Sequence, residues 1–236
     1  MDIVECVRKR KSIRGYKKDP VPQELIKKIL EISTRAPSGL NTQPWEFLVV
    51  EGEVLNNIRK ENVERYSSGE IPNPMFDYKN EGVYYQRQIQ LARQLFVLLN
   101  INREDHEKRN EWLKKGLRFF DAPTAIIVTM DRAKSAQKMA LFDLGIITQT
   151  ICLVAFSYGL GTCIEIQGVF YPEVIRKCTG LPESKQIIMG ISIGYPDWDF
   201  PANQIKTDRV PIDEILSWRE FDIDKSEKLL STTLNG

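Results

Sequence analysis

A long apolar run between residues 139 and 156 constrains the fold more than any other feature of the sequence. Its length approaches the roughly 20 residues that span a bilayer, but Asp143 and the polar cluster at 148–150 interrupt it. We therefore interpret the run as the buried part of a helix over residues 134–158 in a soluble protein, and we expect no membrane partner. With 236 residues, 42% of them hydrophobic, the chain can bury a full core.

Shorter apolar runs before and after this helix predict strands. The run at 125–130 is typical of a buried strand, and residues 45–50, 162–166 and 187–193 are predicted as further strands. Helical periodicity predicts other helices, over residues 3–7, 25–36, 55–66, 84–99, 103–120 and 173–178. One large α/β or α+β domain over residues 1–236 accommodates these elements, because the sequence has no internal repeat, low-complexity tract or linker.

Two polar segments are predicted to lie outside this regular structure. Residues 67–80 contain Gly69, Pro72 and Pro74, and they form a loop long enough to act as a flap over a site. Residues 222–236 form a polar C-terminal arm that frays or wraps a partner.

Charge and residue usage exclude several classes of function. The 33 basic and 32 acidic residues nearly cancel, so no net field favours nucleic acid or an anionic membrane. The one histidine, His106, lies in a highly charged stretch that reads as a solvated helix face, so a Ser–His or Cys–His pair is not expected. Together with four scattered cysteines, it also argues against a metal site. An enzyme with this composition would need a bound organic cofactor.

The four cysteines also bear on the cellular compartment. They form no CxxC pair, and no apolar N-terminal run resembles a secretory signal, so we expect a reduced, cytoplasmic protein.

The densest basic cluster lies near the N-terminus. Residues 8–11 are Arg-Lys-Arg-Lys, and Arg14 follows them. A solvated face or a nucleic-acid patch would account for such a cluster. An extended backbone, however, would turn Arg10, Ser12 and Arg14 to one side, and two guanidinium groups with a hydroxyl suit a phosphate monoester.

Two further segments carry less information when each is taken alone. Residues 36–45, Ala-Pro-Ser-Gly-Leu-Asn-Thr-Gln-Pro-Trp, are rich in turn formers and indicate a structured loop. Residues 159–168 begin like a dinucleotide-binding fingerprint, but Ile164 stands where the third glycine would be and the segment ends a helix instead of opening one. Cys163 is expected to be a buried packing residue.

Taken in order, these segments resemble the paired signature of the nitroreductase family. The resemblance spans residues 3–221 and includes the late element Lys-Thr-Asp-Arg-Val-Pro at 206–211. It implies an α+β fold with a central, mostly antiparallel mixed sheet flanked by helices, in an intertwined homodimer with an FMN site at the subunit interface.

The resemblance also implies where FMN would bind. The phosphate and the pyrimidine edge of the flavin would contact the two basic segments, at Arg10, Lys11, Ser12, Arg14, Lys206 and Arg209. The loop at residues 36–45 of the other subunit would also border the flavin. Its contacting residues would be Pro37, Ser38, Gly39, Asn41 and Gln43. Backbone N–H groups near flavin N5 would come from Ile166, Gln167 and Gly168.

The implied activity is ping-pong hydride transfer from NADH or NADPH, through flavin N5, to an electron-poor acceptor such as a nitroaromatic or a quinone. No side chain is expected to act as a nucleophile. Segments 84–87 and 119–123 resemble a subgroup that reduces nitroaromatic acids, so Tyr85 and Arg87 are candidate substrate contacts. The alternatives are a flavoenzyme of the same fold with other chemistry, such as a reductive dehalogenase or a dehydrogenase, a non-catalytic flavin-binding protein, and a nucleic-acid-binding module.

Overall fold

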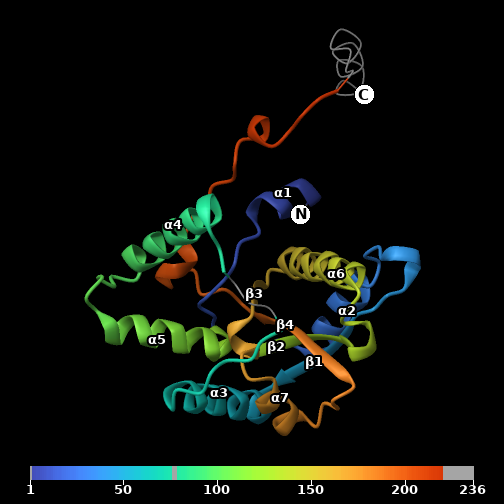
Figure 1. The fold of residues 1–236 in the computed structure, drawn as a ribbon, viewed down its shortest axis with the longest axis horizontal. Helices are drawn as coiled ribbons and strands as arrows, with labels where there is room; N and C mark the ends of the chain where they lie inside the picture. The colour runs from blue at the N-terminus through green and yellow to red at the C-terminus, as the bar shows by residue number, and fades with distance from the viewer. Residues whose placement is uncertain (1, 76–78, 220–236) are drawn as a thin grey trace. The chain divides into compact units, whose positions relative to one another are not determined.

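The computed structural model describes residues 2–75 and 79–219, and Figure 1 shows its helices and strands. The chain divides into two compact units, Met1–Ile205 and Lys206–Gly236. The second unit is described only to residue 219 and contains one 3₁₀ turn, Ile212–Glu214. The predicted arm at 222–236 lies outside the described residues, as do residues 76–78 of the predicted flap. A single domain over the whole chain stays a prediction.

The centre of the first unit is a four-stranded antiparallel sheet. Its strands are β1 (Glu46–Glu51), β2 (Thr124–Asp131), β3 (Gly161–Glu165) and β4 (Lys185–Gly194), arranged in the order β1-β2-β4-β3. All three pairings are antiparallel. A single parallel bridge, between Ser12 and Thr162, extends the sheet at the β3 edge. The α+β fold and its mostly antiparallel mixed sheet, expected from the sequence, are therefore confirmed.

Seven helices surround the sheet in the described residues. They are α1 (Ile3–Lys9), α2 (Gln23–Ser33), α3 (Gly52–Ser67), α4 (Gly82–Leu98), α5 (His106–Leu117), α6 (Lys138–Ser157) and α7 (Pro172–Thr179). Helices α2 and α6 lie on one side of the sheet, and α3 and α7 lie on the other (Figure 1).

The covering of both faces explains why β2 is apolar at nearly every position. Ile126 and Val128 join the core beneath α2 and α6, whereas Ala125 and Ile127 join the second core, which includes Leu55 of α3. Successive side chains of a strand point to opposite faces, so a strand covered on both faces must be apolar throughout.

In part of helix α6, polar side chains are buried and apolar side chains are exposed, the reverse of the usual arrangement. It is the only helix among the described residues long and apolar enough to cross a membrane, and 44% of its most apolar stretch is buried. Asp143 and Thr148 are buried, whereas Met139 and Phe142 are mostly exposed. The polar residues that interrupt the apolar run therefore face inward, and an uncovered apolar strip faces outward.

The helix predicted over residues 103–120 is too long in both directions. Helix α5 begins at His106 and ends at Leu117, because the chain then enters a turn with positive φ angles at Phe119, Phe120 and Asp121. Backbone in that conformation cannot continue a right-handed helix.

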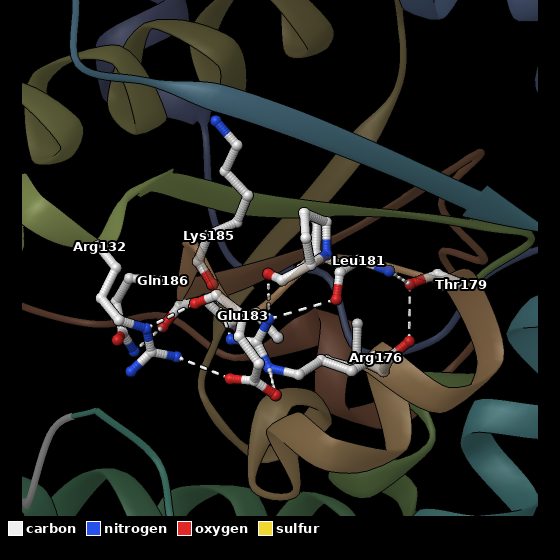
Figure 2. Close-up of polar contacts among 10 residues, drawn as sticks. Arg132, Arg176, Thr179, Leu181, Glu183, Lys185 and Gln186 are labelled. Carbon is white, nitrogen blue, oxygen red and sulfur yellow. Dashed lines mark hydrogen bonds and ion pairs between the residues drawn. The ribbon is translucent and has the colours of Figure 1, made fainter.

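The connection from α7 to β4 is held by a compact polar network (Figure 2). Gly180 ends α7 in the left-handed conformation that helix C-termini favour. The guanidinium of Arg176 donates to the carbonyls of Pro182 (2.6 Å) and Lys185 (2.7 Å). Glu183 lies 3.3 Å from both Arg176 and Arg132. This turn closes one end of the β2–β4 pair, where Asp131 faces Lys185.

Candidate active site

The basic segment after α1 is extended and lies along the edge of β3. The N–H of Ile13 donates to the Thr162 carbonyl (2.9 Å), and the N–H of Lys17 donates to the Tyr195 carbonyl (2.9 Å). Ile13 is buried, whereas Arg10, Ser12 and Arg14 are only partly buried. The alternation follows from extended geometry, in which successive side chains point to opposite sides.

Buried Asn203 fixes this segment from the other side. Its Oδ1 accepts the N–H of Arg14 (2.7 Å), and its backbone carbonyl accepts the Lys11 ammonium (2.8 Å). Arg10 and Arg14 form no ion pair with a carboxylate in the described part of the chain. Both guanidinium groups therefore remain available to an anionic ligand.

The structure separates the members of this basic segment. Arg10 and Lys11 line a recess of ≈ 240 Å³ that Ser12 and Arg14 do not line. The Arg14 guanidinium instead lies 5.9 Å from the ring centre of Phe120, within the range of a cation–π interaction.

The segment after β3 lies beside Phe119, the residue that precedes Phe120. Gln167–Val169 forms a 3₁₀ turn, and the N–H groups of Gln167 and Gly168 donate no hydrogen bond within the described residues. A Cβ at Gly168 would lie 2.5 Å from the Phe119 ring, so only glycine fits there. The Gly168 carbonyl accepts a hydrogen bond from Asn62 Nδ2 (2.9 Å).

The turn at Phe119–Asp121 joins these two parts of the site. Its three residues have φ angles of 56°, 51° and 58°, a left-handed conformation that costs about 1–2 kcal/mol for each residue with a Cβ. Both phenylalanines are buried, Phe119 against Gly168 and Phe120 below Arg14. Strained backbone of this kind persists where surrounding contacts determine it, and such places often lie at functional sites.

The buried carboxyl of Glu165 lies near the Arg14 and Arg59 cations. Neither oxygen of Glu165 has a hydrogen-bond partner among the described residues. The neighbouring Ser192 hydroxyl donates to the Cys163 carbonyl instead (3.3 Å). Burial raises the pKa of Glu165 well above its usual value, although the Arg14 and Arg59 cations oppose part of the shift.

Two other titratable groups line the same buried region. Burial raises the pKa of Cys163 to about 12, so its thiol is protonated at neutral pH, consistent with the packing role that the sequence indicated. Burial also raises the pKa of Tyr16, whose hydroxyl donates to the Ile13 carbonyl (2.8 Å).

The loop at residues 36–45 is attached elsewhere, to α6. The N–H of Gly39 donates to Asp143 Oδ1 (3.1 Å), and the Ser38 hydroxyl accepts the N–H of Gln43 (3.0 Å). Leu40 is fully exposed, and its φ angle is positive, which is unusual for a leucine. Across the described residues, no hydrogen bond or ion pair links this loop to the basic segment. Within one chain, different elements thus hold the two halves of the signature, α6 the loop and β3 the basic segment.

Comparison with known proteins identifies the family. The sequence model of the Nitroreductase family matches residues 7–195. The chain belongs to the nitroreductase family. Curated relatives of this chain include a nitrobenzene nitroreductase of Ectopseudomonas oleovorans, 32% identical over 220 residues that cover 92% of this chain and 96% of the relative. A 4-nitrobenzoate reductase of Nocardioides sp. (strain LMS-CY) is also 32% identical and covers 88% of this chain and 85% of its own.

Solved structures agree with this assignment. The FMN- and NADPH-dependent nitroreductase NfnB from Sphigopyxis sp. strain HMH superposes with a TM-score of 0.88 at 28% identity, over 94% of this chain and all of its own. The FMN-dependent NfnB from Mycobacterium smegmatis, in complex with NADPH, has a TM-score of 0.86 at 25% identity and covers 92% of this chain and 97% of its own. The predicted family and its nitroaromatic-reductase subgroup are therefore confirmed.

The structure does not test the roles of four further predicted site residues. Lys206 and Arg209 belong to the second unit, where the Arg209 guanidinium donates to the Thr207 hydroxyl (3.0 Å). Tyr85 is half exposed on α4, and Arg87 stacks 5.8 Å from the Tyr84 ring. Their roles in phosphate and substrate binding stay predictions.

The predicted flap at residues 67–80 is described in part. Its first half contacts residues 170–171, which follow the 3₁₀ turn Gln167–Val169. The N–H of Asn73 donates to the Phe170 carbonyl (2.9 Å), and the Tyr171 hydroxyl donates to the Glu70 carbonyl (3.0 Å). A flap function for the loop stays a prediction. No group of three or more potential metal ligands lies in the described part of the chain.

Sequence reasoning missed the residues that surround Gly168. The segment 119–123 resembles the subgroup, but nothing in two phenylalanines indicates left-handed backbone, since bulky residues rarely adopt it. Arg59 and Asn62 of α3 look like ordinary surface polar residues in a helix of low hydrophobicity. Glu165 is the last residue of β3, and its sequence context gives no sign of its burial.

Proposed function

We propose that this nitroreductase family member is an FMN-dependent oxidoreductase that uses NADPH or NADH to reduce nitroaromatic compounds, quinones or similar electron-poor molecules by a ping-pong mechanism. One observation carries the proposal. The Arg14 cation and the free N–H groups of Gln167 and Gly168, far apart in sequence, lie around one turn. Relatives named as nitrobenzene and 4-nitrobenzoate reductases support the acceptor class.

The residues present fit FMN. Arg10 and Arg14 form no carboxylate pairs in the described chain, so a phosphate or an electron-rich ring edge can use their charge. The unused N–H groups of Gln167 and Gly168 can donate to ring acceptors, and buried donors without a partner are costly unless a ligand satisfies them. When bound, FMN would supply the hydride chemistry that no side chain of this protein provides.

The chain itself contributes binding, orientation and electrostatics. Arg10, Lys11 and Ser12 would hold the phosphate end, and Arg14 would stabilise negative charge on the pyrimidine edge. The Gly168 backbone would fix the distance at which hydride is transferred. Burial raises the pKa of Glu165, which favours the neutral form of this carboxyl near Arg14.

A homodimer completes the proposed site. Leu40 is fully exposed in a strained loop, and Met139 and Phe142 form an uncovered apolar strip on the same helix that anchors the loop. A second copy of the chain would cover these groups and bring Pro37, Ser38, Asn41 and Gln43 to the neighbouring flavin.

The first test is an absorption spectrum of the purified protein, followed by anaerobic titration with NADPH or NADH and by oxidation with 4-nitrobenzoate or a quinone. We expect a yellow protein that is bleached by the nicotinamide and recovers its colour with the acceptor. A colourless protein that takes up no added FMN would contradict the proposal. Reduction without reoxidation by any acceptor would favour a non-catalytic flavin protein.

A matched pair of variants tests the phosphate assignment. Arg10→Ala should raise the Kd for FMN about tenfold and so lower FMN occupancy, because one charge-assisted contact contributes about 1.5 kcal/mol. Arg8→Ala removes a cation from the exposed face of α1 in the same cluster, and it should leave occupancy unchanged. Equal loss in both variants would indicate a diffuse basic patch and not a phosphate site.

A second pair tests the dimer. Phe142→Glu should shift the protein to a monomer and release FMN, as measured by size-exclusion chromatography with light scattering and by absorption. Val97→Glu places the same charge at an exposed apolar position on α4 and serves as the control. A Phe142→Glu protein that stays dimeric and yellow would refute this interface.

A further inference from the structure

Two polar side chains of α3 hold the left-handed turn from behind. Arg59 Nε donates to the carbonyl of Arg118 (2.9 Å), and its Nη2 donates to the carbonyl of Ala122. These carbonyls lie immediately before and after the three left-handed residues. Asn62 is three residues further along α3, on the same helix face, and its Nδ2 donates to the carbonyl of Leu117 (3.1 Å).

The same Asn62 amide also holds the segment after β3. It donates to the carbonyl of Gly168 (2.9 Å) and is completely buried. The Gln167 side chain packs onto α5, where a Cβ at Gly116 would lie 2.0 Å from its Oε1. A Cβ at Gly190 would lie 2.8 Å from the Phe119 ring, so this ring fits tightly between β4 and Gly168. Residues 167–168 are thus enclosed by α3, α5, β4 and the turn.

The turn also fixes the cation on its other side. Phe120 is buried against Trp112, with ring centres 5.8 Å apart, and it presents its ring to the Arg14 guanidinium. Asp121 pairs with Arg118 (2.8 Å) and Lys115 (2.9 Å), which holds the last left-handed residue to α5. Adjacent residues of one turn therefore contact both groups that the proposed function assigns to the flavin ring.

We infer that the left-handed turn Phe119–Asp121, held by Arg59 and Asn62, is a positioning element that sets the Gln167–Gly168 backbone and the Arg14 guanidinium relative to one another for hydride transfer. This inference rests on the proposed function, because it assigns a purpose to the spacing between two predicted flavin contacts. The residues of the turn and of α3 act through Arg14 and Gly168 and need not touch the flavin. A rigid turn suits this purpose, since hydride transfer depends steeply on geometry.

The test uses the FMN-loaded protein with two variants in the positioning element. Phe120→Leu keeps an apolar side chain but removes the ring below Arg14. Asn62→Ala releases the carbonyls of Leu117 and Gly168. For each variant, the midpoint potential of bound FMN is measured, together with the rate of flavin reduction at saturating NADPH.

Arg176→Met is the matched control. Arg176 also donates to backbone carbonyls of a turn, but at the opposite end of the β2–β4 pair, so its loss should lower stability without reaching the site. We expect both positioning variants to shift the potential and to slow flavin reduction about tenfold at unchanged FMN occupancy. Arg176→Met should change neither quantity.

The outcomes separate this inference from the proposed function. A wild-type protein that binds no FMN would overturn both. A wild-type protein that turns over normally, with Phe120→Leu and Asn62→Ala indistinguishable from Arg176→Met, would overturn the inference alone and make the turn a structural feature. If Asn62→Ala fails to fold, Phe120→Leu decides the matter, because it leaves every hydrogen bond of Arg59 and Asn62 in place.

Discussion

The turn after α7 and the turn after α5 are both held by an arginine that donates to backbone carbonyls, Arg176 in the first and Arg59 in the second (Figure 2 shows the first). The first turn has one left-handed residue, Gly180, for which that conformation carries no steric cost. The second has three consecutive left-handed residues, none of them glycine.

The two turns also differ in what they contact. Arg176 and Glu183 satisfy only their own turn and the adjoining strand ends, and Glu183 is largely exposed. Arg59 and Asn62 act from a different helix, and their turn touches Arg14 and Gly168. The comparison indicates that the strained turn after α5 is held by contacts from other elements of the fold, as backbone strain requires.

The two turns should differ most in the stability lost when the main apolar side chain of each, Phe119 or Leu181, is truncated. Phe119→Ala should lower the free energy of unfolding by about 3–5 kcal/mol, because it empties a fully buried ring site and leaves the strain uncompensated. Leu181→Ala, in the turn after α7, should cost about 1–2 kcal/mol, since Leu181 is only partly buried. Chemical denaturation measures both values. Equal costs would mean that the two turns are equivalent in packing.

Replacing the two arginines should lower the free energy of unfolding by amounts that differ less. Arg59→Met should cost about 2–3 kcal/mol, because it leaves the carbonyls of Arg118 and Ala122 unpaired in a largely buried place. Arg176→Met should cost about 1 kcal/mol, since water can reach part of its turn. Thermal unfolding at one pH compares them. A larger loss for Arg176→Met would reverse the comparison.

Glu165 gives the stability of the strained region a pH dependence. Burial raises the pKa of this carboxyl in the folded protein above its usual value of about 4.5. As the pH rises past that value, the unfolded chain loses the proton first, so the stability of the folded state falls until the pH reaches the folded pKa. Glu165→Gln should therefore gain about 1 kcal/mol over wild type between about pH 5 and pH 6. Parallel stability curves for the two proteins would contradict the assignment.

The smallest change in the free energy of unfolding is expected at Asp121, the last residue of the strained turn. Asp121→Asn should cost only about 0.5 kcal/mol, because it loses partly exposed ion pairs with Arg118 and Lys115 while asparagine tolerates the left-handed conformation. Asp121→Val should cost about 1–2 kcal/mol more, since a β-branched residue is strained there. Urea denaturation of the two variants measures the strain at this position. Equal stability would mean that the turn relaxes to another conformation.

The sequence by itself determined the family, the sheet and most helices of this protein. The continuous apolar run at residues 125–130 had to become a strand buried on both faces, because apolar surface on each face needs cover. The ordered motifs at 10–14, 36–45 and 159–168 identified the family. These features depend on residue type and spacing along the chain, which a sequence records directly.

Only the tertiary structure decided how the site is assembled. It bound the basic segment to the β3 edge through Ser12 and Thr162, and it buried Glu165 beside Arg14. It also forced Phe119 and Phe120 into a conformation that their own preferences oppose. Local propensity describes what a residue favours alone, whereas here a tight fit against Gly168 and the carbonyl contacts of Arg59 outweigh it. Contacts between residues far apart in the chain supply that energy, so no short segment of the sequence could reveal it.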